Sequence, residues 1–158
     1  MLLDPKPPHV LNVRAVRREL GLTQSRLADL TSVSLRTIQG CEQGWRKPSP
    51  GLEKLLLLLL INKRAGTDLA ERKCWVETVC PPEVRAQCPA YQAAQGGLCW
   101  LMTGKLYRGL RLPSWAHKRA MCEKCPLMRS LLGDTTGLFI TAEPTNPQVA
   151  VEESPTQA

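Results

Sequence analysis

Hydrophobic residues in the first third of the chain recur at helical spacing. Val13, Val16 and Leu20 lie three or four positions apart, and Gly21 is suited to end the helix that they predict. Three more helices are expected between about residues 10 and 65, over Gln24–Leu30, Leu35–Gln43 and Pro50–Lys63. Each is preceded by a hydroxyl side chain of the kind that caps helix N-termini, namely Thr23, Ser34 and Ser49.

The pattern changes after residue 66. Residues 67–130 hold six of the seven cysteines and show little hydrophobic periodicity or internal repetition, so an apolar core alone is not expected to fold them. From 131 to 158 the chain is polar, acidic and rich in proline. The predicted fold class is mainly α. It comprises a flexible arm at 1–9, a helical domain at 10–66, a small metal- or cluster-stabilised domain at 67–130, and a mostly disordered tail at 131–158 with a short extended piece at 137–141.

Charge is unevenly distributed along the 158 residues. Residues 1–66 carry 11 Lys and Arg against 5 Asp and Glu, residues 67–130 carry 10 against 5, and the tail carries none against 4. A basic body suits a polyanionic partner such as nucleic acid. The longest apolar run, Leu55–Ile61, is far shorter than the ~20 residues that span a bilayer, and the N-terminus has no signal pattern. A cytoplasmic protein without membrane association is therefore expected.

Residues 22–48 contain several positions that agree with one known motif. They are Thr23-Gln24, Leu27-Ala28, Val33-Ser34, Ile38, and Glu42-x-Gly44 followed by Arg46-Lys47-Pro48. With these residues the stretch resembles the phage-repressor and Cro type of helix-turn-helix, the XRE-like family, over about Leu11–Lys63. The resemblance implies a homodimer that binds double-stranded DNA, with the third helix in the major groove and half-sites ~10 base pairs apart. It also implies a structural role for Glu42.

The resemblance places the DNA contacts at particular positions. Groove-facing candidates are Leu35, Arg36, Gln39 and Gly40, of which Arg36 suits guanine, Gln39 suits adenine and Leu35 suits the thymine methyl. Phosphate contacts are expected from Gln24, Ser34, Arg46 and Lys47.

Two positions depart from the family pattern. Ser32 stands where the family has the turn glycine, although serine tolerates a left-handed backbone less well. Cys41 occupies a usually apolar position and is expected to be a buried, small hydrophobic residue.

The remaining six cysteines are Cys74, Cys80, Cys88, Cys99, Cys122 and Cys125. In a reducing compartment such a cluster favours a metal or redox site over a disulfide framework. Cys122-x-x-Cys125 is the strongest element, because two cysteines at this spacing can bind one metal ion or cluster. Three Cys-Pro pairs are typical of iron–sulfur ligand runs.

A second resemblance covers about residues 72–127. The matching pieces are Cys74-Trp75, Cys80-Pro81, Cys88-Pro89-Ala90-Tyr91, Cys99-Trp100-x-x-x-Gly104, Gly109, Lys118 and Cys122-x-x-Cys125. They resemble a cysteine-rich module called the two-CW domain, which occurs joined to signalling and regulatory domains and so implies a sensor. Tyr107 stands where a further cysteine is expected.

Three kinds of chemistry are open for these cysteines. The first is an iron–sulfur cluster on Cys88, Cys99, Cys122 and Cys125, with Cys74 and Cys80 as the next candidates. The second is structural zinc, ranked lower because only one close cysteine pair is present. The third is thiol–disulfide switching without metal. His117 is expected to be a surface residue rather than a ligand.

The combined prediction is a two-domain transcription regulator and not an enzyme. Its first domain reads DNA, and its second senses redox state, oxygen or metal. The alternative is a protein-interaction module in which zinc or disulfides serve the cysteine-rich domain structurally.

Overall fold

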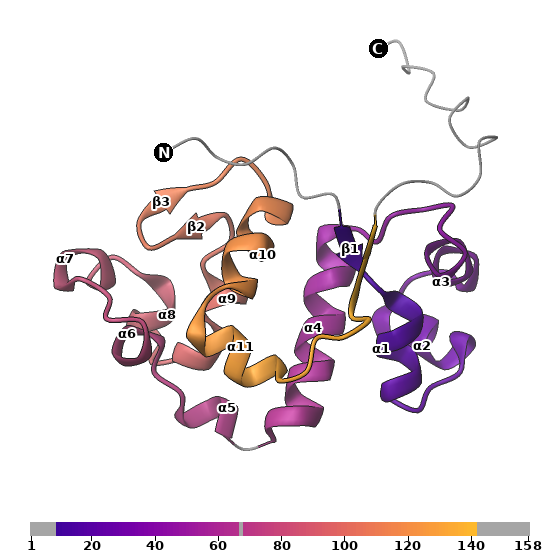
Figure 1. Cartoon of the computed structure of the whole chain (residues 1–158), viewed down its shortest axis with the longest axis horizontal. Coiled ribbons are helices and arrows are strands. Elements are labelled where there is room, and N and C mark those ends of the chain that lie inside the picture. The colour runs from indigo at the N-terminus through magenta and orange to yellow at the C-terminus, as the bar shows by residue number, and fades with distance from the viewer. Residues whose placement is uncertain (1–8, 67, 142–158) are drawn as a thin grey trace, which may run out of the picture. The chain divides into compact units, whose positions relative to one another are not determined.

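The computed structural model describes residues 9–66 and 68–141, which divide into two compact units (Figure 1). The N-terminal unit consists of residues 9–55 and 136–141, and the cysteine unit consists of residues 56–66 and 68–135. The boundary falls inside helix α4, Pro50–Ala65, rather than at its end near residue 66. Both units are mainly helical, so the predicted fold class is confirmed.

The predicted helices of the N-terminal unit are present. They are α1 at Val13–Glu19, α2 at Gln24–Thr31, α3 at Leu35–Glu42 and the first part of α4. Thr23 Oγ1 accepts the Arg26 amide at 3.1 Å, and the hydroxyl groups of Ser34 and Ser49 cap α3 and α4 in the same way. Asn12 caps α1 by accepting the Ala15 amide at 3.1 Å, a cap that the sequence pattern did not reveal.

The small core of this unit lies between α1, α2 and α3. Val16, Leu27 and Ile38 are fully buried, and Cys41 is only 5% exposed, which confirms its predicted role as a small apolar residue. Ser32 ends α2 with a φ of 56°, so it keeps the left-handed backbone for which the family uses glycine.

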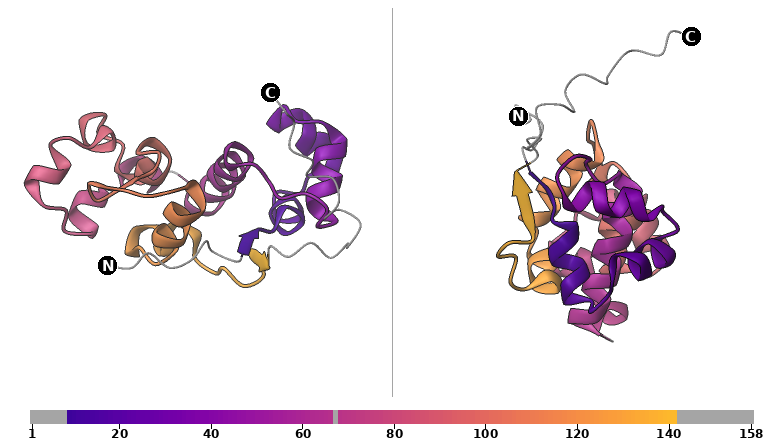
Figure 2. Two further views of the ribbon diagram at one scale, coloured as in Figure 1. Left: turned by 90° about the horizontal axis from the view of Figure 1, so that it is seen from above. Right: turned by 90° about the vertical axis from the view of Figure 1, so that its right-hand side faces the viewer.

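A two-stranded sheet adds to the unit an element that the helical pattern did not predict. Strand β1, His9–Leu11, pairs antiparallel with strand β4, Phe139–Thr141, and the two strands stay adjacent in both views of Figure 2. The Asn12 amide then donates to the Leu138 carbonyl at 2.7 Å, and the Leu11 amide donates to the Glu53 carboxylate at 3.1 Å. Residues distant in sequence therefore fix the start of α1.

The strand corrects two predicted boundaries. His9 is paired rather than part of the arm, and residues 131–141 are not tail, since α11 continues to Leu132 and Leu138 is buried. Of the extended piece expected at 137–141, residues 139–141 form β4, while 137 and 138 belong to a turn. The rest of the predicted arm and tail, 1–8 and 142–158, lies outside the described residues.

The cysteine unit consists of short elements. After the second part of α4 come α5 Asp68–Glu71, α6 Cys74–Glu77, α7 Pro82–Arg85, α8 Pro89–Gln92, the 3-10 helix η1 Gly96–Leu98, α9 Cys99–Met102, hairpin strands β2 Leu106–Tyr107 and β3 Leu110–Arg111, α10 Trp115–Glu123 and α11 Pro126–Leu132. Its apolar core includes Trp100, Leu112, Leu127 and Leu131. Within the described ranges, no helix has the length and apolar character needed to cross a membrane.

The carboxylate of Glu42 joins three helices of the N-terminal unit. Arg17 on α1 donates to both of its oxygens, and Gln24 on α2 donates Nε2 to Oε2 at 2.8 Å. The Glu42 side chain is 1% exposed, so this charged hydrogen-bonded group is nearly free of water. The structural contact implied for Glu42 is thus present, and it fixes α3 against α1 and α2.

The environment of Glu42 also determines its protonation. Burial alone would raise the pKa of the Glu42 carboxyl, but hydrogen bonds from Arg17 and Gln24, with the charges of Arg17 and Arg14, lower it below its ordinary value. A lowered folded-state pKa stabilises the fold above the unfolded pKa of about 4.3. That contribution is lost as the pH falls through the folded-state pKa.

We expect Glu42→Gln to lower the free energy of unfolding at pH 7 by about 3 kcal/mol, because it leaves the Arg17 guanidinium without its counter-charge. The difference from wild type should shrink below pH 4, where Glu42 itself becomes protonated. Urea unfolding between pH 3 and 7 measures both effects. The control is Asp29→Asn on the exposed side of α2, expected to change stability by less than about 0.5 kcal/mol. Wild-type stability of Glu42→Gln at pH 7 would contradict this role.

Candidate functional site

The first turn of α3 presents the predicted base-reading side chains to solvent. Leu35 is 41% exposed although it is apolar, and Arg36 is exposed beside it. Gln39, one turn later, is half-buried. An exposed leucine and arginine at the start of a helix-turn-helix third helix have the placement that major-groove contacts require.

Gly40 has a different environment from its three predicted companions. It is buried, and its carbonyl accepts the amides of Trp45 and Arg46 at 3.0 and 3.2 Å. A methyl group at this position would meet the Cβ of Arg46 at 3.6 Å. Because 3.6 Å is an ordinary van der Waals distance, the loop that follows α3 does not require glycine here, and the predicted contact of Gly40 with DNA stays a prediction.

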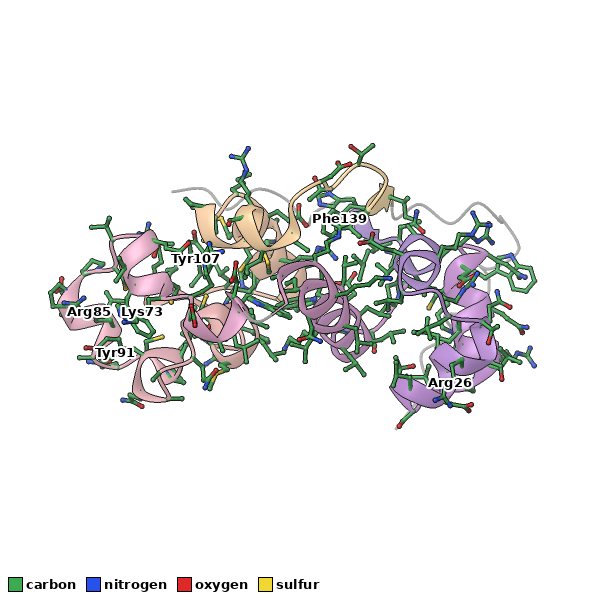
Figure 3. The ribbon with its side chains drawn as sticks, turned by 90° about the horizontal axis from the view of Figure 1, so that it is seen from below. Arg26, Lys73, Arg85, Tyr91, Tyr107 and Phe139 are labelled. Atoms are coloured by element: carbon green, nitrogen blue, oxygen red, sulfur yellow. The ribbon has the colours of Figure 1, made fainter. Side chains whose placement is uncertain are left out.

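That loop adds cations next to α3. Arg46 and Lys47 are exposed, and Arg46 Nη1 donates to Thr37 Oγ1 at 3.3 Å, which holds the guanidinium beside the first turn of α3. Arg26 on α2, labelled in Figure 3, is another exposed cation that the sequence analysis did not select. Arg26 lies inside the matched motif, but the motif itself does not mark its position as one that contacts DNA.

The remaining two phosphate-contact candidates already have partners within the protein. Gln24 donates to Glu42, and Ser34 Oγ accepts the Thr37 amide at 3.1 Å. Both lie at the N-terminal ends of helices, where a second hydrogen bond to phosphate is geometrically compatible. Their contacts with DNA also stay predictions.

The six cysteines of the cysteine unit meet around one cavity. Its volume is about 420 Å³, and all six contribute to its lining: Cys74, Cys80, Cys88, Cys99, Cys122 and Cys125. All are free thiols, and they come from segments as far apart as α6 and the residue before α11. The sequence spacing alone did not establish that one site gathers all six.

Two of these cysteines stand in similar turns, a local likeness that the sequence pattern did not reveal. Cys74-Trp75-x-x-Thr78 and Cys99-Trp100-x-x-Thr103 each form one helical turn, closed by a threonine hydroxyl that donates to the cysteine carbonyl at 2.6 and 2.7 Å. The next residue has a positive φ in both copies, 50° at Val79 and 57° at Gly104.

A pair of glycines brings the two turns together. A Cβ on Gly96 would lie 2.4 Å from the Arg72 carbonyl and 2.7 Å from the Cys74 amide, and one on Gly97 would lie 2.1 Å from the Leu69 carbonyl. No side chain fits at either position without moving backbone. The pair immediately before Leu98-Cys99 was the sequence signal for this contact, and the sequence analysis missed it.

The thiols form two groups that share Cys74. The Cys74 and Cys99 thiols share a hydrogen bond, which lowers the pKa of Cys74 and, with burial, raises the pKa of Cys99 well above its usual range. Cys122 and Cys125 lie close enough to Cys99 to raise its pKa further. Cys80 is instead close to Cys88 and Cys74.

This grouping bears on the ligand set expected from spacing, which stays a prediction. Cys99, Cys122, Cys125 and Cys88 all line the cavity, and Cys74 is also near Cys99, while Cys88 is near Cys80. Among residues 9–66 and 68–141, no three His, Cys, Asp or Glu side chains are placed to hold one metal ion. His117 pairs with Ser114 Oγ at 2.8 Å and is not part of the cavity lining.

Two further groups give the cavity its electrostatic character. Lys118, which is 2% exposed, donates from Nζ to Thr103 Oγ1 and to the Leu106 carbonyl. Burial raises the pKa of Cys122 to about 12, against the opposing charge of Lys118. Tyr107, labelled in Figure 3, lines the same cavity, and burial together with the nearby thiols Cys125 and Cys122 raises its pKa.

The comparison with protein families gave one match. Residues 13–61 match the family described as helix-turn-helix, which supports a DNA-binding role for this stretch. Comparison of the chain with curated proteins and with solved structures gave no match. The resemblance of residues 72–127 to the two-CW domain stays a prediction.

We expect Gly97→Ala to destabilise the cysteine unit by about 2 kcal/mol or more, because the new methyl group forces η1 away from α5. Thermal unfolding followed by tryptophan fluorescence measures the change, since Trp100 Nε1 donates to the Gly97 carbonyl. The matched control is Gly51→Ala in α4, where nothing lies within 4 Å of the added Cβ. It should be neutral or stabilise by up to about 1 kcal/mol. Equal effects of the two substitutions would contradict the close approach.

If the two turns are equivalent, substitutions at their sixth positions, Val79 and Gly104, should have opposite effects on stability. Val79 is 81% exposed, so Val79→Gly loses no packing and relieves an unfavourable φ, and we expect it to stabilise the protein by about 0.5–1 kcal/mol. Gly104→Val should destabilise it by about 1–3 kcal/mol. Denaturant unfolding of both variants checks the pair. Destabilisation by Val79→Gly would show that the turns differ.

Proposed function

We propose that the protein is a sequence-specific, double-stranded DNA-binding transcription regulator whose cysteine unit senses redox state, oxygen or metal. The observation that carries the DNA-binding part is the exposed first turn of α3, with Arg36 at its surface and Arg46 held beside it. The helix-turn-helix match over residues 13–61 supports the same role.

The base contacts follow from side-chain chemistry. Arg36 would bind guanine O6 and N7 as a bidentate donor, Gln39 would pair with adenine, and Leu35 would contact a thymine methyl. Backbone phosphates would be bound by Gln24, Ser34, Arg46 and Lys47. A homodimer would place two such helices about one turn of DNA apart, ~10 base pairs, and so bind a palindromic operator.

The sensing part of the proposal depends on the thiol-lined cavity. The chain passes between the two units inside α4 and again between Thr135 and Thr136. The second passage follows α11, which begins immediately after Cys125, and leads into β4 of the N-terminal unit. A chemical change at the cavity thus has a covalent route to β4, which pairs with β1, the strand that precedes α1.

The test is gel-shift binding to an operator selected from random duplexes. Arg36→Ala should weaken specific binding by about 1–3 kcal/mol and relax base preference at one position of each half-site. Arg129→Ala, an exposed arginine of α11, removes the same charge from the cysteine unit and should leave binding unchanged.

Salt dependence separates this function from docking on a protein partner. Binding through phosphates should weaken steeply as salt rises, because neutralised phosphates release counterions. A flat salt response, or equal effects of Arg36→Ala and Arg129→Ala, would overturn DNA reading by α3 and favour a protein-interaction module.

A further inference from the structure

We propose that the cavity of the cysteine unit binds an iron–sulfur cluster held by Cys74, Cys99, Cys122 and Cys125. The proposal names the ligands of the sensing site. Only its regulatory consequence rests on the proposed function. The binding itself is a property of the cysteine unit and is measurable without DNA.

The lining of the cavity has the chemistry that such a cluster requires. Thiolates are soft anionic ligands, and both two-iron and four-iron clusters are bound by four of them. Six free thiols converge here, although Cys74, the first, and Cys125, the last, are separated by about fifty residues of sequence. Gathering six thiols around one hollow has no packing advantage over apolar side chains, so their convergence points to a ligand.

The size of the cavity favours a cluster over one metal ion. Four thiolates around a single zinc lie only about 3.8 Å apart, because each Zn–S bond is about 2.3 Å. The described residues provide no group of three ligands arranged in that way, while the cavity measures about 420 Å³. Even at ~30 Å³ for each atom, the volume of a water molecule in the liquid, the eight atoms of a four-iron core need only about 240 Å³. In a cluster the thiolates bind different irons and so stand farther apart.

The choice of four thiols follows from their grouping. Cys99 is near Cys74, Cys122 and Cys125, whereas Cys80 is near Cys88 and Cys74. Two similar turns, locked by Thr78 and Thr103, supply one thiol each from Cys74 and Cys99, and the close approach at Gly96 and Gly97 makes those thiols meet. The Cys122-x-x-Cys125 turn, closed by a 2.9 Å backbone hydrogen bond, supplies the other two.

Charge and shielding at the cavity also suit this occupant. Four thiolates leave a bound cluster anionic, and the buried ammonium of Lys118 lines the cavity together with the guanidinium of Arg108. Arg108 is held in place by donating to the carbonyl of Thr78, within one of the two turns. Trp100 and Leu127, both about 1% exposed, provide an apolar wall that limits access of water.

The full-length protein should therefore be purified anaerobically and reconstituted with ferric iron, sulfide and a thiol reductant. We expect a brown protein with broad visible absorption and with iron and acid-labile sulfide in equal amounts, about two or four of each per chain. Metal analysis of the same sample measures zinc. One zinc per chain with no retained iron and sulfide would overturn the proposal, as would a colourless protein whose thiols are paired as disulfides.

Single serine substitutions test the ligand set. Cys74→Ser, Cys99→Ser, Cys122→Ser and Cys125→Ser should each lower retained iron at least several-fold. Cys80→Ser and Cys88→Ser are matched controls from the same cavity and should retain wild-type iron, as should Cys41→Ala in the N-terminal unit. If a ligand variant fails to fold, the control variants still test the ligand set. Loss of iron in Cys88→Ser together with retention of iron in Cys74→Ser would overturn it.

The two proposals fail independently. Iron and sulfide content needs no operator, whereas the Arg36→Ala and salt tests need no cluster. A protein that binds its operator but retains no iron refutes only the cluster. A protein that holds the cluster but shows a flat salt response refutes only DNA reading.

Discussion

The cysteine unit depends on one steric constraint, the contact of Gly96 and Gly97 with the backbone of residues 69–74. Any Cβ there would come within 2.7 Å of a backbone atom, so glycine is required for η1 to lie against the segment that leads into α6. The contact brings Cys99 close to Cys74, although twenty-four residues lie between them in the sequence. The hairpin, α10 and α11 then complete the cavity with Tyr107, Lys118, Cys122 and Cys125.

In each unit a buried charged group connects several elements by hydrogen bonds. In the N-terminal unit the Glu42 carboxylate accepts hydrogen bonds from α1 and α2 and fixes the orientation of α3. In the cysteine unit the Lys118 ammonium ties α10 to Thr103 and to the carbonyl of Leu106 at the hairpin. A buried charge is costly unless it is fully hydrogen-bonded, so both groups tolerate few alternative arrangements of the elements around them.

The two proposed activities place different demands on the chain. DNA reading requires exposed side chains on a fixed helix, and Leu35 and Arg36 meet that demand because their neighbour Ile38 anchors α3 in the core. Cluster binding requires polarisable ligands shielded from water, which the thiol-lined cavity provides. The covalent passages inside α4 and after Thr135 are the routes by which the second activity would regulate the first.

The sequence by itself determined the helix-turn-helix. Its helices are local structures whose caps, turn residues and apolar positions all lie within a few residues of one another, so Thr23, Ser34 and Ile38 were sufficient to predict them. It also singled out the cysteines. Tertiary structure decided what no local pattern contains: the pairing of β1 with β4, the buried environment of Gly40, and the gathering of six thiols at one cavity. These depend on contacts between residues far apart in sequence, where spacing carries no distance information.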